Sequence, residues 1–242
     1  MQVEQKKRTV LKSLTWRITA TLTTTSLVYY FTGKLDTAIE IGLIEVFLKM
    51  YIYYLHERLW ARVKFGIGNQ PNFVIVFTGL SGSGKSRIAE KVYEKIEKKK
   101  KMKVEYFNGE RIREVFPQTG FSPQERKDHI QKVTHFVQIL EKNQTNVIVC
   151  LEAPFEDSRQ NMRKIFTNYI EIYINTPLDY CLKNDRKGFY AKALSGEIKD
   201  FVGVSIDYEP PTNPELTFNI EEKSIENCSN EIISYLKNKK FL

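Results

Sequence analysis

Residues 72–86 read Asn-Phe-Val-Ile-Val-Phe-Thr-Gly-Leu-Ser-Gly-Ser-Gly-Lys-Ser, and this stretch decides the fold. Its first seven residues are largely apolar and β-branched, which is typical of a strand buried in a parallel sheet. The other eight match the phosphate-binding pattern of two glycines that flank four residues and precede Lys-Ser. Apolar side chains then recur every four residues at positions 88, 92 and 96, which predicts a helix. A chance glycine-rich turn is the alternative, and the order strand, loop and helix argues against it.

The loop at 79–86 predicts a binding site for ATP and Mg²⁺. Its glycines allow backbone N–H groups to point inward at a phosphate, and the following helix adds its positive dipole end. Lys85 would act as a point charge on the β and γ phosphates, which makes it a predicted catalytic residue, and Ser86 would offer its hydroxyl to Mg²⁺. The predicted ATP-binding residues are Gly79, Leu80, Ser81, Gly82, Ser83, Gly84, Lys85 and Ser86.

The rest of the C-terminal part alternates between predicted strands and helices. Further short apolar runs lie at 104–107, 146–151, 169–174 and 216–220. Helical periodicity separates them, clearest at 130–140 and 225–236. Alternation of this kind predicts an α/β fold with a mainly parallel sheet and helices on both faces. In such folds the functional residues lie at the carboxyl ends of the strands.

The composition sets limits on the class of protein. Of 242 residues, 42% are hydrophobic and 27% charged, which excludes a collagen-like or wholly disordered chain. A mean hydropathy of -0.38 excludes a polytopic membrane protein. Three cysteines and three histidines without paired spacing argue against a disulfide scaffold and a zinc site. The net charge of +8 suits an anionic partner, which could be nucleic acid, an acidic membrane surface, or phosphate and sulfate ligands.

A change in composition near residue 70 predicts two domains. Residues 1–69 carry ten basic and five acidic side chains, a net charge of +5 in under a third of the chain. The stretch at 65–71, Phe-Gly-Ile-Gly-Asn-Gln-Pro, reads as a linker. We therefore place a helical module at 1–69 and the phosphate-binding domain at 70–242.

Several polar and aromatic residues follow the predicted strands. Glu110 could bind Mg²⁺ through water or accept a proton, or it could be a carboxylate that stabilises a helix N-terminus. Arg113 and Arg126 could clamp an anionic substrate, or form surface ion pairs. Phe121 and Phe201 could stack on a base, or pack in the core.

Residues 187–203 form a basic segment with several glycines. It could be a mobile lid that brings Lys187 over phosphates and excludes water. An ordinary surface helix is the alternative.

Residues 72–242 resemble the adenylyl-sulfate kinase family. Beyond the glycine loop, the segments that carry the resemblance are 108–110 with Arg113, 120–122, 125–127, 154–155, 176–178, 187–190, 196–199, 208–211 and 213–215. The resemblance implies a P-loop, nucleoside-kinase-like fold. It also implies ATP-dependent phosphorylation of the 3′-hydroxyl of adenosine 5′-phosphosulfate, which gives 3′-phosphoadenosine 5′-phosphosulfate during sulfate assimilation.

The family's site residues carry over by position. The resemblance implies that Arg113, Phe121 and Arg126 lie on the sulfate of the substrate, and that Phe201 stacks on its adenine. The full set of predicted substrate-binding residues is Asn108, Arg113, Phe121, Arg126, His129, Lys187 and Phe201. Lys85 and Glu110 are the predicted catalytic residues, with Mg²⁺ at Ser86 and, through water, at Glu110. No nucleic acid is expected as a partner.

This chain also departs from the family pattern. The usual Asp-Gly-Asp-Asn-Val-Arg is Asn-Gly-Glu-Arg-Ile-Arg at 108–113, and a usual Asn is His129. The usual Ile-Ser is Glu152-Ala153, and the usual Arg-Asp-Pro-Lys is Asn-Asp-Arg-Lys at 184–187. Two alternatives therefore stay open: a kinase for another small anionic hydroxylated metabolite, and a nucleotide-binding regulatory module without turnover.

Residues 1–69 predict a helical hairpin. Two stretches, 13–31 and 37–55, are each about long enough to cross a bilayer, and a turn at 33–36 joins them. Basic residues flank the pair, so both ends should face the cytoplasm. The segment also resembles a small uncharacterised family of two-helix predicted membrane proteins. This predicts membrane association with the kinase domain on the cytoplasmic face.

Charges within the hairpin bear on this prediction. Glu45 and Lys49 lie four residues apart and could pair with each other, or with a second copy of the hairpin in a homo-oligomer. The alternative is a cytoplasmic protein whose soluble hairpin dimerises or packs on the kinase domain.

Overall fold

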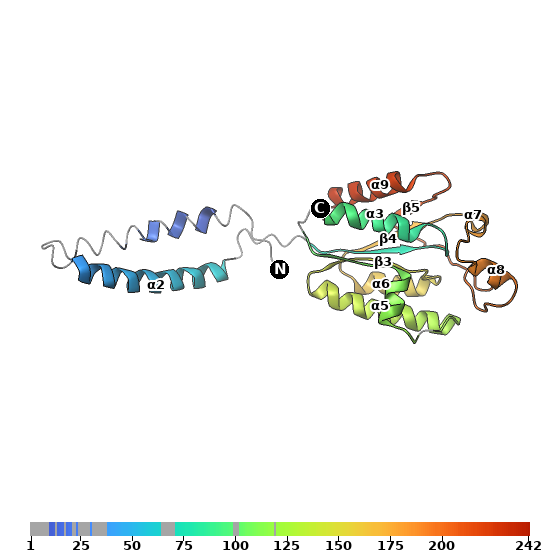
Figure 1. Ribbon diagram of the computed structural model, residues 1–242, viewed down its shortest axis with the longest axis horizontal. Coiled ribbons are helices and arrows are strands. Elements are labelled where there is room, and N and C mark those ends of the chain that lie inside the picture. Colours follow the sequence, from blue (N-terminus) through green and yellow to red (C-terminus); the bar gives the residue numbers. More distant parts are fainter. Residues whose placement is uncertain are drawn as a thin grey trace. The chain divides into compact units, whose positions relative to one another are not determined.

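The computed structural model describes residues 10–12, 14–16, 18–20, 23, 30, 38–63, 71–98, 102–118 and 120–242. The chain divides into two units, which we call the N-terminal unit, Met1–Asn69, and the C-terminal unit, Gln70–Leu242. Figure 1 shows the helices and strands of each.

The C-terminal unit is built on a five-stranded parallel sheet with the strand order β2-β3-β1-β4-β5. The strands are β1 (Val74–Thr78), β2 (Val104–Phe107), β3 (Asn146–Cys150), β4 (Tyr169–Ile174) and β5 (Leu216–Phe218). In the centre of the sheet, Val74 of β1 is in register with Val147 of β3 and Tyr169 of β4. The predicted α/β class is thus confirmed, with strand ends within two residues of the predicted ones.

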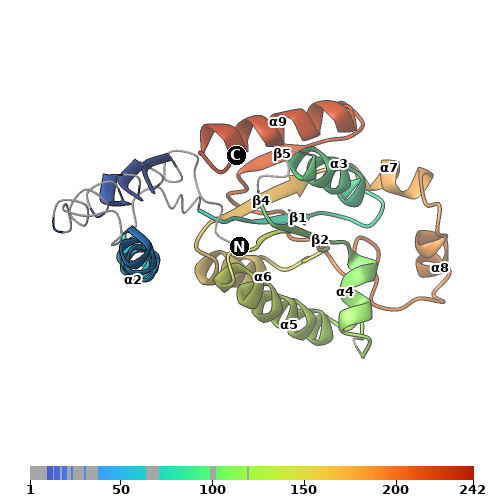
Figure 2. The ribbon, with the colours of Figure 1, turned by 60° about the vertical axis from the view of Figure 1, so that its left-hand side comes forward.

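Helices cover both faces of the sheet. The helices α3 (Lys85–Glu97) and α9 (Ile225–Asn238) lie on one face, and α5 (Pro123–Lys142) and α6 (Glu156–Ile165) lie on the other (Figure 1). Three short helices, α4 (Gly109–Val115), α7 (Leu178–Lys183) and α8 (Phe189–Leu194), lie toward the carboxyl ends of the strands (Figure 2). These ends are therefore the part of the unit that carries loops and short helices.

Strand β1 explains why two layers of helices are needed. Successive side chains of a strand point to opposite faces. Phe73, Ile75 and Phe77 are buried in the core on the side of α3 and α9, whereas Val74 and Val76 are buried on the side of α5. Because β1 is apolar on both faces, it is stable only in the middle of a covered sheet.

The N-terminal unit contains α2 (Ala38–Arg62). This helix continues seven residues beyond the predicted end at residue 55, while most of the predicted first helix at 13–31 lies outside the described residues. No helix within the described ranges is both long and apolar enough to cross a membrane. The transmembrane prediction is therefore not supported for α2, which carries Glu57, Arg58 and Arg62 in its last turns.

Contacts join residues 12–16 to the second half of α2. Lys12 forms an ion pair with Glu57 at 3.1 Å, and the rings of Trp16 and Tyr53 meet edge to face with centroids 4.9 Å apart. Since the earlier residue of one segment contacts the later residue of the other, the segments run antiparallel. The side chain of Glu45 lies outside the described side chains, so its predicted pairing with Lys49 and the homo-oligomer stay predictions.

Candidate active site

The glycine loop joins the end of β1 to the start of α3, as the sequence predicts. Gly79 and Gly84 have φ angles of 140° and 96°, in the region that favours glycine. A Cβ atom on Gly79 would lie 2.5 Å from the carbonyl oxygen of Ile174, and one on Gly84 would lie 2.8 Å from Cδ1 of Ile220. The loop therefore curls tightly against β4 and the segment after β5, and larger residues do not fit at these two positions.

The polar side chains of the loop are suited to bind phosphate. Lys85 is buried, and its Nζ donates to the carbonyl oxygens of Gly79 at 2.8 Å and Leu80 at 2.6 Å. Burial lowers the pKa of this lysine. The buried hydroxyl of Ser83 has no hydrogen-bond partner within the described residues, and Ser86 is exposed at the first turn of α3. A phosphate group would supply acceptors for these donors.

A pocket lies beside the loop, between α4, α5 and the end of β3. Its lining residues come from these three elements and the loops next to them: Gly109, Arg113, Gly120, Arg126, His129, Ile130, Cys150, Leu151, Glu152, Ala153 and Pro154. We call this the acceptor pocket. Three of the predicted substrate-binding residues, Arg113, Arg126 and His129, line it.

Two arginines and one aromatic ring form a cluster in and beside the acceptor pocket. The guanidinium carbons of Arg113 and Arg126 lie 4.3 Å and 5.5 Å from the centroid of the Phe121 ring, which is 49% exposed. Arg126 donates from Nε to the carbonyl of Phe121 at 2.8 Å. Its other nitrogens donate to Glu152 Oε2 at 2.8 Å and to the carbonyl of Asp200 at 2.9 Å. The structure thus brings together Arg113, Phe121 and Arg126, which the family resemblance places at the sulfate, and their role in binding stays a prediction.

His129 adds a neutral group to this pocket. Burial, together with the positive charges of Arg113, Lys132 and Arg126, lowers its pKa to about 4. The imidazole is therefore uncharged near pH 7, and the positive charge of the pocket comes from its arginines.

The residues before and within α4 form a second group near the loop. The side chain of Asn108 caps α4, because its Oδ1 accepts from the backbone N–H of Arg111 at 2.9 Å. Glu110 forms an ion pair with Lys187, which lowers the pKa of this carboxyl. The structure thus brings Glu110 and Lys187 together, but neither side chain lines the acceptor pocket.

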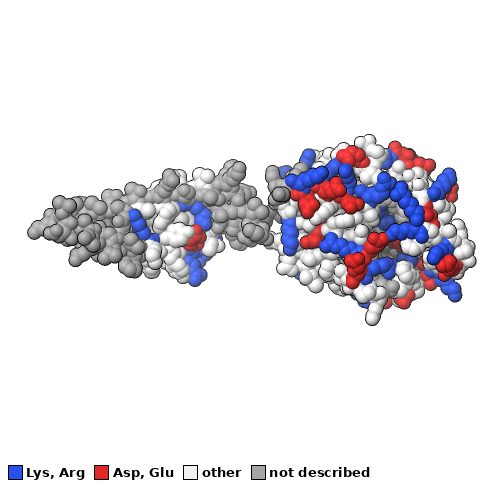
Figure 3. Space-filling model, viewed as in Figure 1, with Lys and Arg blue, Asp and Glu red and all other residues white. Residues whose placement is uncertain are grey.

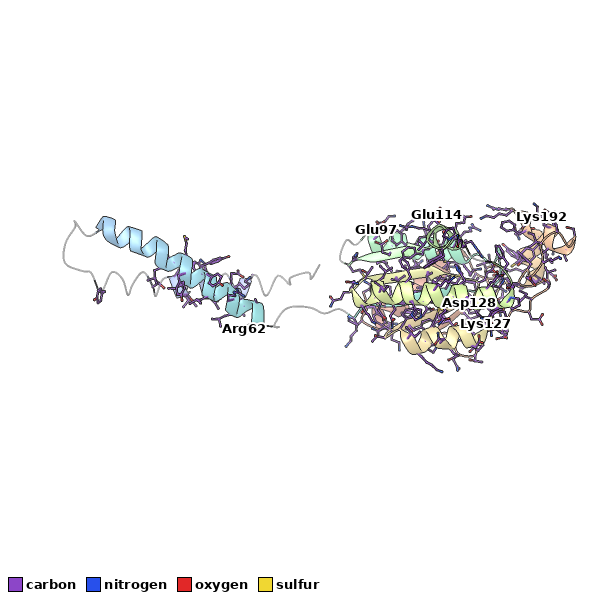
Figure 4. All side chains as sticks on the ribbon, turned by 90° about the horizontal axis from the view of Figure 1, so that it is seen from below. Arg62, Glu97, Glu114, Lys127, Asp128 and Lys192 are labelled. Carbon is purple, nitrogen blue, oxygen red and sulfur yellow. The ribbon has the colours of Figure 1, made fainter. Side chains whose placement is uncertain are left out.

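The predicted lid, residues 187–203, contains α8 and packs against the glycine loop. Tyr190 donates its hydroxyl to the carbonyl of Ser81 at 2.9 Å. Phe201 is buried with its ring centroid 5.0 Å from that of Tyr190, so it lies in a small core under α8 and not among the pocket-lining residues. Lys192 lies on α8 at the outer end of the unit (Figure 4) and pairs with Glu197 at 3.0 Å.

Known proteins are similar to this chain in sequence. Residues 71–219 match the family model described as adenylylsulphate kinase. The chain belongs to the adenylyl-sulfate kinase family. The adenylyl-sulfate kinase of Halothermothrix orenii is 34% identical over 175 residues, which cover 72% of this chain and 94% of that protein. That of Thermodesulfovibrio yellowstonii is 40% identical over 172 residues, covering 69% of this chain and 85% of that one.

A solved adenylyl-sulfate kinase has the same fold. The Mycobacterium tuberculosis APS kinase, solved in complex with AMPPNP and APS, is 32% identical and has a TM-score of 0.65. The match covers 69% of this chain and 98% of that one. Separately, residues 10–61 match the family described as Predicted membrane protein (DUF2061). Both resemblances drawn from the sequence are confirmed.

Two residues near this site are not among the predicted site residues. Glu152 lines the acceptor pocket, and its place after the 146–151 strand is the sequence signal that points to it. Tyr208 belongs to a family motif, and its hydroxyl lies 2.7 Å from Thr78 Oγ1, at the end of β1. No spacing in the sequence relates Tyr208 to Thr78, because 130 residues separate them.

Proposed function

We propose that this protein transfers the γ-phosphoryl group of ATP to the 3′-hydroxyl of adenosine 5′-phosphosulfate. One observation supports this most directly: the glycine loop with Lys85 follows β1, and the acceptor pocket with Arg113 and Arg126 follows the neighbouring strand β3. A phosphate donor and an anionic acceptor would therefore meet at one edge of the sheet. The names of the family and of its relatives supply the identity of both substrates.

ATP and Mg²⁺ would bind at the loop. Lys85 would leave the loop carbonyls for the β and γ phosphates, and Ser86 would offer its exposed hydroxyl to Mg²⁺. Mg²⁺ binds through one or two protein ligands, water and the phosphates of a nucleotide, so the Ser86 hydroxyl could serve as its protein ligand. When bound, the ion neutralises phosphate charge during transfer.

The acceptor would bind through its two anionic groups and its adenine. Arg113 and Arg126 carry the positive charge for the phosphosulfate, and a guanidinium can donate two parallel hydrogen bonds to such a group. Phe121, half-exposed beside both, offers an apolar face. Lys187 would approach the phosphates from the lid. The adenine-stacking role of Phe201 requires its ring to leave the core under α8.

The acceptor can be identified by a coupled assay of ADP release. Adenosine phosphosulfate should accelerate ADP release strongly, and mass spectrometry of the product should find one added phosphate at the 3′ position. A panel of other anionic hydroxylated metabolites tests the alternative acceptors that Asn108 and His129 leave open. No acceleration by the phosphosulfate would refute the proposed substrate, and ATP binding without turnover on any acceptor would indicate a regulatory module.

We also propose that the N-terminal unit associates with a membrane without a full crossing by α2. The match of residues 10–61 to a family of predicted membrane proteins supports this. So do the large apolar side chains that α2 exposes: Met50, Tyr51, Tyr53, Tyr54, Leu55 and Leu59.

On the C-terminal unit, Lys and Arg lie beside Asp and Glu over most of the face seen in Figure 3. This pattern is unlike the basic stripe that binds nucleic acid.

A further inference from the structure

Transfer of a phosphoryl group to a hydroxyl requires a group that receives the hydroxyl proton. A carboxylate is a suitable acceptor when it lies within reach of the reacting hydroxyl. Among the described residues that line the acceptor pocket, Glu152 is the one carboxylate. To act in this way, the Glu152 carboxylate must lie where the γ phosphate of ATP and the acceptor hydroxyl would meet.

The backbone at Glu152 is fixed close to the glycine loop. Its carbonyl accepts from the hydroxyl of Thr78 at 2.7 Å, and Thr78 directly precedes Gly79, the first residue of the loop. The next residue, Ala153, has a φ of 41° and its carbonyl accepts from the buried Arg159 at 2.5 Å. Hydrogen bonds on both sides of the turn therefore hold Glu152 between the loop and the pocket.

A hydrogen bond to one carboxylate oxygen fixes the orientation of the Glu152 side chain. Oε2 accepts from Arg126 at 2.8 Å, and the side chain is 28% exposed, so it is accessible to a ligand in the pocket. Burial lowers the pKa of Lys85 and of Arg113, and the negative charge of Glu152 opposes this effect at both residues. Glu152 thus interacts with the predicted phosphate-binding lysine and with both substrate arginines.

The other candidates are engaged elsewhere or are poor proton acceptors. The side chain of Glu110 is 71% exposed and is paired with Lys187. The amide of Asn108 caps α4 and has no basic lone pair. Burial, together with the positive charges of Arg113 and Arg126, disfavours a proton on His129 and lowers its pKa.

We propose that Glu152 receives the proton of the acceptor hydroxyl during phosphoryl transfer, and this inference rests on the proposed function. The acceptor oxygen forms a bond to the γ phosphorus while the bond from that phosphorus to the β–γ bridging oxygen breaks. The electron pair of the broken bond leaves on ADP. The hydroxyl proton moves to the Glu152 carboxylate and later passes to solvent.

The test is Glu152→Gln in the full chain, assayed by ADP release at saturating ATP with the acceptor varied. Glutamine keeps the size of the side chain and an oxygen that accepts from Arg126, but it cannot take up the proton. We expect kcat to fall about 100-fold or more, with the KM for the acceptor within about threefold. Glu152→Asp should recover part of the kcat. The matched control is Glu226→Gln, the same change in the Lys95–Glu226 ion pair between α3 and α9, which should keep kcat within twofold.

The outcomes separate this inference from the proposed function. A kcat within threefold of wild type in Glu152→Gln, or a change in KM alone, would overturn the role of Glu152 while wild-type turnover still supports the kinase. If the wild type uses a different acceptor, the substrate assignment is wrong. The kcat of Glu152→Gln relative to wild type on that acceptor then decides for or against the role of Glu152. If wild type phosphorylates no acceptor, both proposals fail. Thermal unfolding of each variant checks that the fold is kept.

Discussion

Replacement of Arg159 by methionine should destabilise the C-terminal unit strongly. Arg159 lies on α6 with a fully buried side chain. It donates to the carbonyls of Ala153 and Glu209, each at 2.5 Å, and to Glu156 Oε2 at 2.6 Å, and its Nε lies 3.3 Å from Glu171 Oε1. Methionine would fill much of the volume but would leave the three hydrogen-bond acceptors without this donor and Glu171 without one of its two cations.

The magnitude follows from the burial of Glu171. This carboxylate is 1% exposed and would keep Arg163 as its remaining cation. Loss of one partner from a buried ion pair costs about 3–5 kcal/mol, because the other charge stays buried. The two carbonyls that lose their donor would lower the free energy of unfolding further. With a urea m-value of about 2 kcal/mol/M, the midpoint of unfolding should fall by roughly 2 M.

Urea unfolding followed by far-UV circular dichroism is the appropriate assay. Both tryptophans of the chain, Trp16 and Trp60, lie in the N-terminal unit, so tryptophan fluorescence would not report on α6. The control is Lys127→Met, which removes an exposed ion pair with Asp157 and should cost less than about 1 kcal/mol. A loss of under 1 kcal/mol in Arg159→Met would refute the reasoning.

The loss of stability caused by Arg159→Met should also depend on pH. Burial already raises the pKa of Glu171, and removal of a cation raises it further. A carboxyl whose pKa is raised on folding costs stability as the pH rises above its ordinary value of 4.5. The loss of stability in Arg159→Met should therefore shrink as the pH falls from 7 toward that ordinary value.

Three further predictions concern the site and the N-terminal unit. Lys85→Ala should lower kcat by about 1000-fold or more without loss of fold, because the charge acts on the phosphates in the transition state; near-normal turnover would mean that the glycine loop is not the ATP site. His129 has a folded pKa of about 4 against 6.5 for the free group, so between these values the unfolded chain binds the extra proton. From pH 7 to pH 5 the wild type should therefore lose about 2 kcal/mol more stability than His129→Asn in urea unfolding, and equal losses would contradict this. In cell fractionation the full chain should pellet with membranes while residues 70–242 stay in the supernatant, and a full chain in the supernatant would exclude the membrane association.

The sequence predicted the fold because local patterns encode it, and it named two of the arginines that the structure places at the acceptor pocket. The run at 72–78 and the glycine loop define β1 and its connection to α3, and parallel strands bring Arg113 and Arg126 to one edge. The role of Glu152 could not be predicted this way. Its ion pair with Arg126 spans 26 residues and depends on how α5 packs against β3.

The transmembrane prediction is not supported for α2. Helix length and flanking charges indicated a crossing, whereas Glu45 and Lys49 within the stretch argued against it. Within the described residues, no helix is both long and apolar enough to cross a membrane. Phe201 likewise follows a family pattern, but its packing against Tyr190 is set by α8, whose fold no local pattern fixes.

The strengths of the ion pairs around the site divide it into a rigid part and a part that can move at small cost. The turn at Glu152 is held by Arg159, a fully buried side chain whose loss costs several kcal/mol. The start of the predicted lid is joined to α4 by the exposed pair of Glu110 and Lys187, which solvent screens. Its end is held more firmly, because Arg126 donates to the carbonyl of Asp200 at 2.9 Å. Lys187 can therefore move at small cost, whereas displacement of Asp200 would disturb an arginine whose geometry the chemistry requires.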